Sequence, residues 1–421
     1  MHGILDILNK VLNNQTVRNG SLFTFFSFCS SGISFVLLII LARFIAPEGY
    51  GHVSLFNTIV TLLGFVISLN TVGLLSVNYF IQTKDDFCKT FVAVSNITCT
   101  CFVLLAILIF LFSNIIQETT GFSILYLYLA LIISFANTYT QNLLNIWRIE
   151  ENIFEYGIYS IAFSFGYFSL AVLLVVGCSI GWEGQVFALS LINILFLIIS
   201  IYITIKKGYL RFVHPSKVHY IDCLKFGIPL IPHSISGWLR QGLDRIFINN
   251  FQSVDFVGLF GFALNFATIL LMIGTAFNNT NSVFISKNLA SNTKAVRAKL
   301  RKQTFLIIFL FIVLMALIWG GAFIFIPFIF PKYVGCIPYL FPVCLGAFFQ
   351  CVYLQFVNFL FFFKRTKILM YITSGISIIH ALSSYYLTQY SISFTIWLGV
   401  FTNFLIALFV FLYSRKVYKI I

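Results

Sequence analysis

The sequence predicts an all-α membrane protein with about twelve transmembrane helices, and three observations support this fold class. Of the 421 residues, 60% are hydrophobic and only 9% are charged, whereas soluble domains carry roughly 25% charged residues. Apolar runs long enough to cross a bilayer recur along the chain. The charged residues gather in the short stretches between these runs. This composition excludes a soluble enzyme, a secreted module and a nucleic-acid-binding protein.

Twelve spans follow from cutting the chain at its polar and charged stretches. The second and eighth runs exceed the length that a bilayer requires, which predicts tilt or protrusion. The predicted spans are 21–45, 51–81, 88–113, 122–147, 154–176, 182–206, 223–249, 255–285, 302–328, 335–363, 366–388 and 391–417.

The distribution of positive charge predicts the orientation of these spans. With the N-terminus placed in the cytoplasm, all but four of the 26 Lys and Arg residues fall in cytoplasmic segments. The four exceptions are Arg43, Arg240, Arg245 and Lys332. Because cytoplasmic loops are enriched in Lys and Arg, we expect both termini to be cytoplasmic. The net charge of +14 then reflects topology rather than nucleic-acid binding.

A cytoplasmic segment divides the spans into two sets of six. We expect an N-terminal six-helix bundle at 1–206, a cytoplasmic linker at 207–222 and a C-terminal bundle at 223–421. The long second and eighth spans occupy matching places and begin near Gly51 and Gly258, about half the chain length apart. This correspondence predicts an internal repeat of two halves with the same orientation.

Residue patterns for covalent chemistry are missing from the sequence. Asp85-Asp86 and Glu150-Glu151 lie in short cytoplasmic loops, and there is no Ser/His/Asp set, phosphate-binding glycine loop or zinc-ligand spacing. The nine cysteines include no CxxC pair and are interpreted as free thiols. We therefore expect a transporter that needs no cofactor or metal, rather than an enzyme.

Polar residues recur at helical spacing within several predicted spans. Such a face must contact protein or a water-filled cavity. For the serine-rich first span we favour helix packing, and for the fourth and seventh spans we favour a cavity. The polar faces comprise Asn137, Gln141, Asn145 and Arg148 in the fourth span, His233, Arg240 and Asp244 in the seventh, and Asn265 and Asn279 in the eighth.

Charges at membrane depth give the most specific hypothesis. Arg240 and Asp244 are four residues apart and can form an ion pair. The surplus of arginine predicts an anionic ligand, because guanidinium binds phosphate through two parallel hydrogen bonds. Arg43 and Arg245 could instead reach the membrane interface. Asp244 is also the first candidate for ion coupling, and His233 could carry a proton or simply pack.

Three short segments resemble a known family. Residues 43–51 read Arg-Phe-Ile-Ala-Pro-Glu-Gly-Tyr-Gly and are similar to the turn after the first helix of Wzx-type polysaccharide repeat-unit flippases, with Ala46 in place of the usual glycine. Residues 226–233 read Phe-Gly-Ile-Pro-Leu-Ile-Pro-His, precede Asp244-Arg245, and resemble the seventh helix of that family. Residues 257–260 fit the start of its eighth helix.

The resemblance implies a fold like that of multidrug (MATE) exporters, with two six-helix bundles around a central cavity. It implies a flippase that moves undecaprenyl-pyrophosphate-linked oligosaccharide units for O-antigen or a similar glycan across a bacterial inner membrane. Its partners would be membrane lipid and the polymerase and other proteins of glycan assembly. The expected cavity residues are Arg43, Asn137, Gln141, Asn145, Arg148, His233, Arg240, Asp244, Arg245, Asn265 and Asn279.

Other functions remain as alternatives. A multidrug or cation antiporter of the same superfamily would need acidic residues in the cavity, and the first two spans contain none between 21–45 and 51–81. A polytopic enzyme of glycan assembly would need a large external loop, which the sequence lacks. A lipid II flippase for peptidoglycan and a membrane scaffold are the further alternatives.

Overall fold

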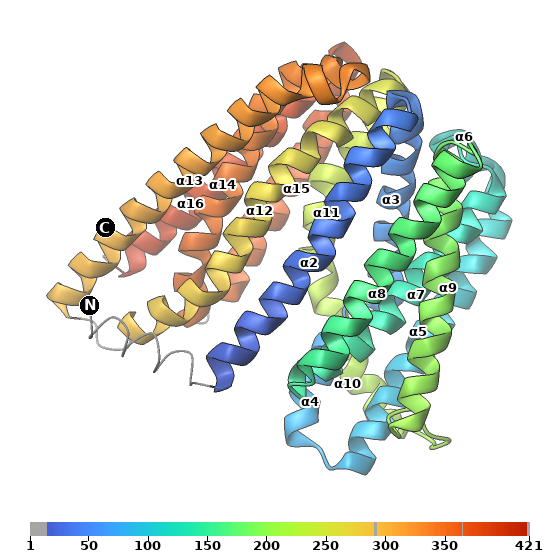
Figure 1. Cartoon of the computed structure of the whole chain (residues 1–421). Coiled ribbons are helices and arrows are strands. Elements are labelled where there is room, and N and C mark those ends of the chain that lie inside the picture. The colour runs from blue at the N-terminus through green and yellow to red at the C-terminus, as the bar shows by residue number, and fades with distance from the viewer. Residues whose placement is uncertain (1–14, 290–292, 364, 419–421) are drawn as a thin grey trace. The chain divides into compact units, whose positions relative to one another are not determined.

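The computed structural model of the chain describes residues 15–289, 293–363 and 365–418. These residues form helices joined by short connections, with no strand among them. Eleven of the helices in this part of the chain are long and apolar enough to cross a membrane, which confirms a multi-pass all-α protein (Figure 1). The predicted seventh span is the exception. Its helix α11 (Ile231–Phe251) carries Arg240, Asp244 and Arg245 and is less apolar than the others.

The chain forms two compact units. Of the described residues, unit 1 comprises those at 15–45 and 56–231, and unit 2 comprises those at 46–55 and from 232 to 418. The segment 207–222, which we expected to be a linker, lies in unit 1 and includes the start of a helix. Residues 46–55, at the start of the predicted second span, belong to unit 2.

Unit 1 contains the helices of the first half of the chain. Helix α2 packs along α8, and α7 packs between α5 and α9. The elements are α2 (Gln15–Phe44), the larger part of α3 (Pro47–Ser68), α4 (Val72–Ile81), α5 (Lys84–Leu111), α6 (Ser113–Thr120), α7 (Ile124–Ile149), α8 (Ile153–Val172), the π-helical turn η1 (Leu173–Gly177), α9 (Trp182–Lys206), α10 (Lys217–Gly227) and the 3₁₀ turn η2 (Ile228–Leu230).

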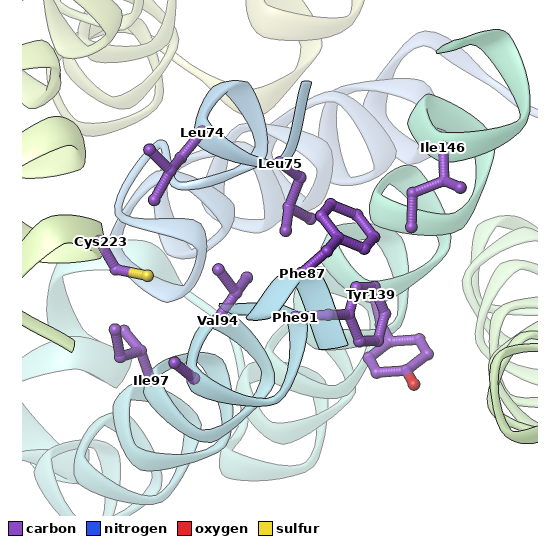
Figure 2. Close-up of a cluster of buried hydrophobic side chains, with 10 residues drawn as sticks. Leu74, Leu75, Phe87, Phe91, Val94, Ile97, Tyr139, Ile146 and Cys223 are labelled. Atoms are coloured by element: carbon purple, nitrogen blue, oxygen red, sulfur yellow. The ribbon is translucent and has the colours of Figure 1, made fainter. Parts of the chain in front are cut away.

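A buried apolar cluster joins four helices of unit 1 (Figure 2). Phe91 of α5 lies edge-on to Tyr139 of α7, with ring centroids 6.2 Å apart. Since lipid is as apolar as these side chains, close packing holds the helices together more than the hydrophobic effect does. The labelled members of the cluster are Leu74, Leu75, Phe87, Phe91, Val94, Ile97, Tyr139, Ile146 and Cys223.

The predicted second span is broken in the structure. Leu69 and Asn70 adopt positive φ angles of 43° and 54°, a conformation that ends a right-handed helix. Gly227 at the end of α10 approaches this turn so closely that a Cβ would lie 2.1 Å from the Leu69 carbonyl oxygen. The long run at 51–81 is thus divided between α3 and α4, rather than being one protruding helix.

Unit 2 contains the helices of the second half. Helix α14 packs against α12, α13 and α16, and α16 also packs against α15 (Figure 1). The long eighth run is one continuous helix of 36 residues. The elements are α11, α12 (Val254–Leu289), α13 (Lys294–Ile329), the 3₁₀ turn η3 (Pro331–Cys336), α14 (Ile337–Phe362), α15 (Thr366–Tyr390) and α16 (Ile392–Tyr418).

Two glycines allow the first turns of α3 and α12 to touch. A Cβ on Gly258 would lie 1.8 Å from the Pro47 carbonyl oxygen, and a Cβ on Gly51 would lie 2.1 Å from that of Val254. Both glycines belong to segments that resemble family motifs. Their shared role is this backbone contact within unit 2.

Candidate functional site

Unit 2 encloses a polar cavity of about 90 Å³ between four of its helices. This volume holds a few water molecules. Apolar side chains of α12, α14 and α16 form much of the wall, and each of the four helices adds at least one polar residue. The polar lining comprises Arg240, Gln241, Asp244 and Arg245 of α11, Thr268 of α12, Gln350 of α14, and Thr395 and Asn403 of α16.

Arg240 is held in place within this cavity. Its Nη1 donates to Oδ1 of Asn403 at 2.8 Å, and its Nε donates to the backbone carbonyl of Ser236 at 3.3 Å. A guanidinium carries five N–H donors in a planar fork, so these two bonds leave other donors to a ligand. Arg240 is therefore fixed in orientation while it retains capacity to bind an anion.

Asp244 does not have the partner that the sequence suggested. Instead of pairing with Arg240, its carboxylate lies 3.1 Å from Nε2 of His380 and accepts a hydrogen bond of 2.5 Å from Ser384. Asp244 and His380 are 2% and 1% exposed. The i, i+4 spacing made the Arg240–Asp244 pair possible, but α15 offers Asp244 two partners in a more enclosed position.

The partners of Asp244 belong to a polar face of α15 that the sequence analysis missed. Its residues recur at helical spacing and are all buried. The pattern could have been found by the same periodicity argument that identified the faces of the fourth and seventh spans. The face consists of Thr373, Ser377, His380, Ser384 and Thr388.

The expected residues of the fourth span lie in unit 1 on α7. Asn145 is buried and donates to Oγ of Ser76 at 2.7 Å, so it packs α7 against α4. Arg148 is exposed, and its Nη2 donates to Oδ1 of Asn145 at 2.7 Å. Gln141 is exposed and Asn137 is half-buried. Whether this face lines a cavity remains a prediction.

The other expected residues are dispersed. Arg43 is exposed in the last turn of α2. Asn265 donates to the Tyr50 hydroxyl at 2.7 Å within unit 2 and is not among the residues that line the cavity. The side chains of His233 and Asn279 lie outside the described residues. Of the predicted set, the structure brings Arg240, Asp244 and Arg245 together in one cavity.

The charges of the cavity favour an anion. Two arginines and one aspartate line it, and Asp244 is already engaged by His380 and Ser384. A positive site in a poorly solvated environment attracts a negatively charged group strongly. Among the described residues, no group of three or more His, Cys, Asp or Glu side chains could hold a metal ion.

A second polar cluster lies in unit 1, around Glu150 at the end of α7. The carboxylate of Glu150 accepts hydrogen bonds from the hydroxyls of Tyr209 and Tyr79 and from the amide of Asn152. Burial, followed by the hydrogen bond to Glu150, raises the pKa of Tyr209 above its ordinary value. Tyr209 thus stays a protonated donor, which joins the connection after α9 to the end of α7.

Comparisons with known proteins agree with this architecture. A family model described as "Polysaccharide biosynthesis protein" matches residues 16–280. A protein of Haemophilus influenzae named Lsg locus putative protein 1 is 24% identical over 396 residues, which cover 92% of this chain and 95% of that protein.

Solved structures of similar fold are membrane transporters. An inward-facing multidrug resistance MATE family transporter of the MOP superfamily matches with a TM-score of 0.75 and 13% identity, over 95% of this chain and 94% of the other. A MOP superfamily transporter from Pyrococcus furiosus matches with a TM-score of 0.66 and 13% identity, over 95% of both chains. The chain therefore has the MATE-like fold that the motifs implied.

Proposed function

The chain belongs to the polysaccharide biosynthesis protein family, and on that premise we propose that it is a flippase for lipid-linked oligosaccharides. Its substrate would be an oligosaccharide unit on undecaprenyl pyrophosphate, for O-antigen or a similar surface glycan. The unit would pass from the cytoplasmic to the periplasmic leaflet of the bacterial inner membrane by alternating access. We place both termini in the cytoplasm, in accordance with the charge distribution.

The observation that carries this proposal is the arginine-lined cavity of unit 2. Arg240 is oriented by Asn403 and Ser236, and Arg245 lines the same space. A pyrophosphate presents several anionic oxygens, to which guanidinium forks can donate pairs of hydrogen bonds. The charge of the cavity lining, rather than its size, therefore matches the charged head of the proposed substrate.

Neutral polar groups beside the arginines suit a sugar. Gln241, Gln350, Thr268 and Asn403 supply amide and hydroxyl groups around the same cavity. Each sugar hydroxyl that enters a membrane without a partner costs several kcal/mol, so such groups lower the barrier to passage. Because flipping breaks no covalent bond, the proposal requires binding and movement rather than catalysis.

The cavity also weighs against the alternatives. A multidrug or cation antiporter would bind a cation, whereas the arginines of this cavity outnumber its single acidic residue, Asp244. An enzyme of glycan assembly would need a sizeable domain between helices. The longest connection between described helices is the segment 207–216, which is too short for one.

The leaflet distribution of the lipid-linked oligosaccharide tests the function. Cells without the protein should accumulate undecaprenyl-pyrophosphate oligosaccharide on the cytoplasmic leaflet, and sugar analysis of that lipid would identify the substrate. An unchanged distribution would refute the flippase proposal, and drug-efflux assays would then test the antiporter.

Variants test the role of Arg240 in the same assay. Arg240→Ala should lower flipping about tenfold or more, since a charge-assisted hydrogen bond contributes roughly 1.5–3 kcal/mol. Arg240→Lys should retain part of the activity. Arg301→Ala, which removes an exposed arginine of α13, is the matched control and should behave as wild type. Unchanged flipping in Arg240→Ala at normal expression would remove Arg240 from the substrate path.

A further inference from the structure

We propose that unit 2 carries a binding site for an anionic glycerophospholipid of the cytoplasmic leaflet. One acyl chain would occupy an apolar groove between α13, α14 and α16, and the phosphate would contact Arg415 at the end of that groove. The inference goes beyond the proposed transport function, because it requires only that the chain crosses a membrane with its C-terminus in the cytoplasm.

The groove encloses about 280 Å³, and its lining is almost entirely apolar. Thr304 is the one polar residue of the described lining, and its buried hydroxyl already accepts a hydrogen bond of 3.1 Å from Gln355. The groove therefore offers little to water or to a sugar. Six of its lining residues are phenylalanines, namely Phe305, Phe348, Phe349, Phe356, Phe404 and Phe411.

Helix α14 forms the floor of the groove, and α13 and α16 form its two sides (Figure 1). Phe348 and Phe356 of α14 are buried, whereas Phe305 of α13 is 62% exposed and Phe404 of α16 is 38% exposed. All three helices are long and apolar enough to cross a membrane. An apolar groove that opens at the surface of such helices is filled by the hydrocarbon of the bilayer.

The lining favours a flexible chain over another helix as the occupant. Helices associate in membranes through small residues that let their backbones approach, and Ala407 is the one small apolar residue of the described lining. At roughly 30 Å³ for each water-sized group, the groove holds about nine such groups. That space suits part of an acyl chain, whereas a helix is about 10 Å across.

One end of the groove is positively charged. Phe411 of α16 contacts Phe356 of α14, with ring centroids 4.9 Å apart. Arg415 is exposed and follows Phe411 by four residues, so it lies on the same face of α16. Because side chains lean toward the N-terminus of their helix, Arg415 leans back toward the groove.

The charge at this end matches an anionic headgroup. Residues 294–302, at the start of α13, add five Lys and Arg residues and no acid. Thr304 of α13 bonds to Gln355, next to Phe356, so this basic segment begins at the same end of the groove as Arg415. Guanidinium binds phosphate through two parallel hydrogen bonds, and anionic lipids attract basic residues at the cytoplasmic surface. In the proposed topology this end is cytoplasmic.

The groove is separate from the arginine-lined cavity. On α14, Val352 of the groove and Ala347 of the cavity are five residues apart, which places them roughly 140° apart around the helix. On α16, the neighbours Phe404 and Asn403 face directions about 100° apart. Since α14 and α16 pack against each other, a lipid with its pyrophosphate in the cavity could not place its chain in the groove. The occupant is therefore a different lipid from the proposed substrate.

Photolabelling maps the site in the unmodified protein. The probe is phosphatidylglycerol with a diazirine on one acyl chain, added to the full-length protein in phosphatidylcholine nanodiscs. We expect label on residues 304–308, 348–356 and 404–411, at least tenfold above that on the exposed apolar residues 103–111 of α5. Excess unlabelled phosphatidylglycerol should remove it. Equal labelling of both regions would overturn the groove, and removal by undecaprenyl phosphate alone would assign it to a polyprenyl chain and overturn the phospholipid.

Two variants test the headgroup contact. Arg415→Gln removes the cation on the groove face, and Lys416→Gln removes an equally exposed cation about 100° further around α16. In the wild type, phosphatidylglycerol should compete for the label about tenfold better than phosphatidylcholine. Arg415→Gln should abolish this preference and Lys416→Gln should keep it. Equal competition in the wild type, or equal effects of the two variants, would overturn the role of Arg415. Neither readout requires flipping, so failure here would leave the proposed function intact.

Discussion

Replacing Gly258 with alanine is a direct test of how α3 and α12 meet. The added Cβ would lie 1.8 Å from the Pro47 carbonyl oxygen, 2.7 Å from its carbon and 3.0 Å from the Gly51 nitrogen. All three atoms belong to the backbone, so no side-chain rotation can relieve the overlap. Overpacking of this kind costs typically 1–3 kcal/mol and occasionally more. We expect about 3 kcal/mol here because one of the two helices must move.

The assay is thermal unfolding of the purified protein in detergent, together with glycan output in cells. Gly258→Ala should unfold several degrees below wild type and reduce output, and Gly51→Ala, whose Cβ would lie 2.1 Å from the Val254 carbonyl oxygen, should behave similarly. The control is Gly320→Ala in α13, where nothing lies within 4 Å of the added Cβ. That change should be neutral or stabilising by about 0.5–1 kcal/mol, since alanine favours a helix. Equal unfolding temperatures for Gly258→Ala and Gly320→Ala would refute the close contact.

Two further predictions concern unit 1. Arg148→Glu should lower glycan output more than Arg148→Lys, because the sign of the charge matters most if this exposed arginine guides an anion; equal losses would indicate that its bond to Asn145 matters instead. Since the pKa of Tyr209 is raised above 10.0, the stabilisation from its protonated hydroxyl is complete below about pH 10 and is lost as pH rises further. Tyr209→Phe should therefore flatten the fall in unfolding temperature above pH 10, and an unchanged fall would contradict the Tyr209–Glu150 contact.

Fold class and most of the spans could be predicted because they depend on local composition. A run of about twenty apolar residues is sufficient to indicate a membrane helix, and eleven of the twelve predicted runs correspond to such helices among the described residues. The break at Leu69 and Asn70 could not be predicted in this way. Neither residue is a glycine or a proline, and the turn packs closely against Gly227, more than 150 residues away in the chain.

Site residues were harder to predict, because periodicity identifies a polar face but not the helix that it meets. The helical spacing in α11 singled out Arg240 and Asp244, which line one cavity together with Arg245. Asp244 was assigned the nearest opposite charge on its own helix, since sequence spacing is the only distance that a sequence provides. The actual partner, His380, lies 136 positions away.

The polar face of α15 shows that polar faces on different helices can be matched with each other from the sequence. Thr373, Ser377, His380, Ser384 and Thr388 recur at helical spacing inside an apolar run, as clearly as the residues of the fourth span. An isolated polar face in lipid is unstable, so two such faces in the same half of the chain stabilise each other by packing together. Applied to the second half, this rule pairs the α15 face with the α11 face that carries the sole acid of that cavity, Asp244. A buried carboxylate needs a cation or several donors, and His380 is the one residue of the α15 face that can be both. Matching helix faces by polarity and charge would thus have predicted the Asp244–His380 contact from the sequence.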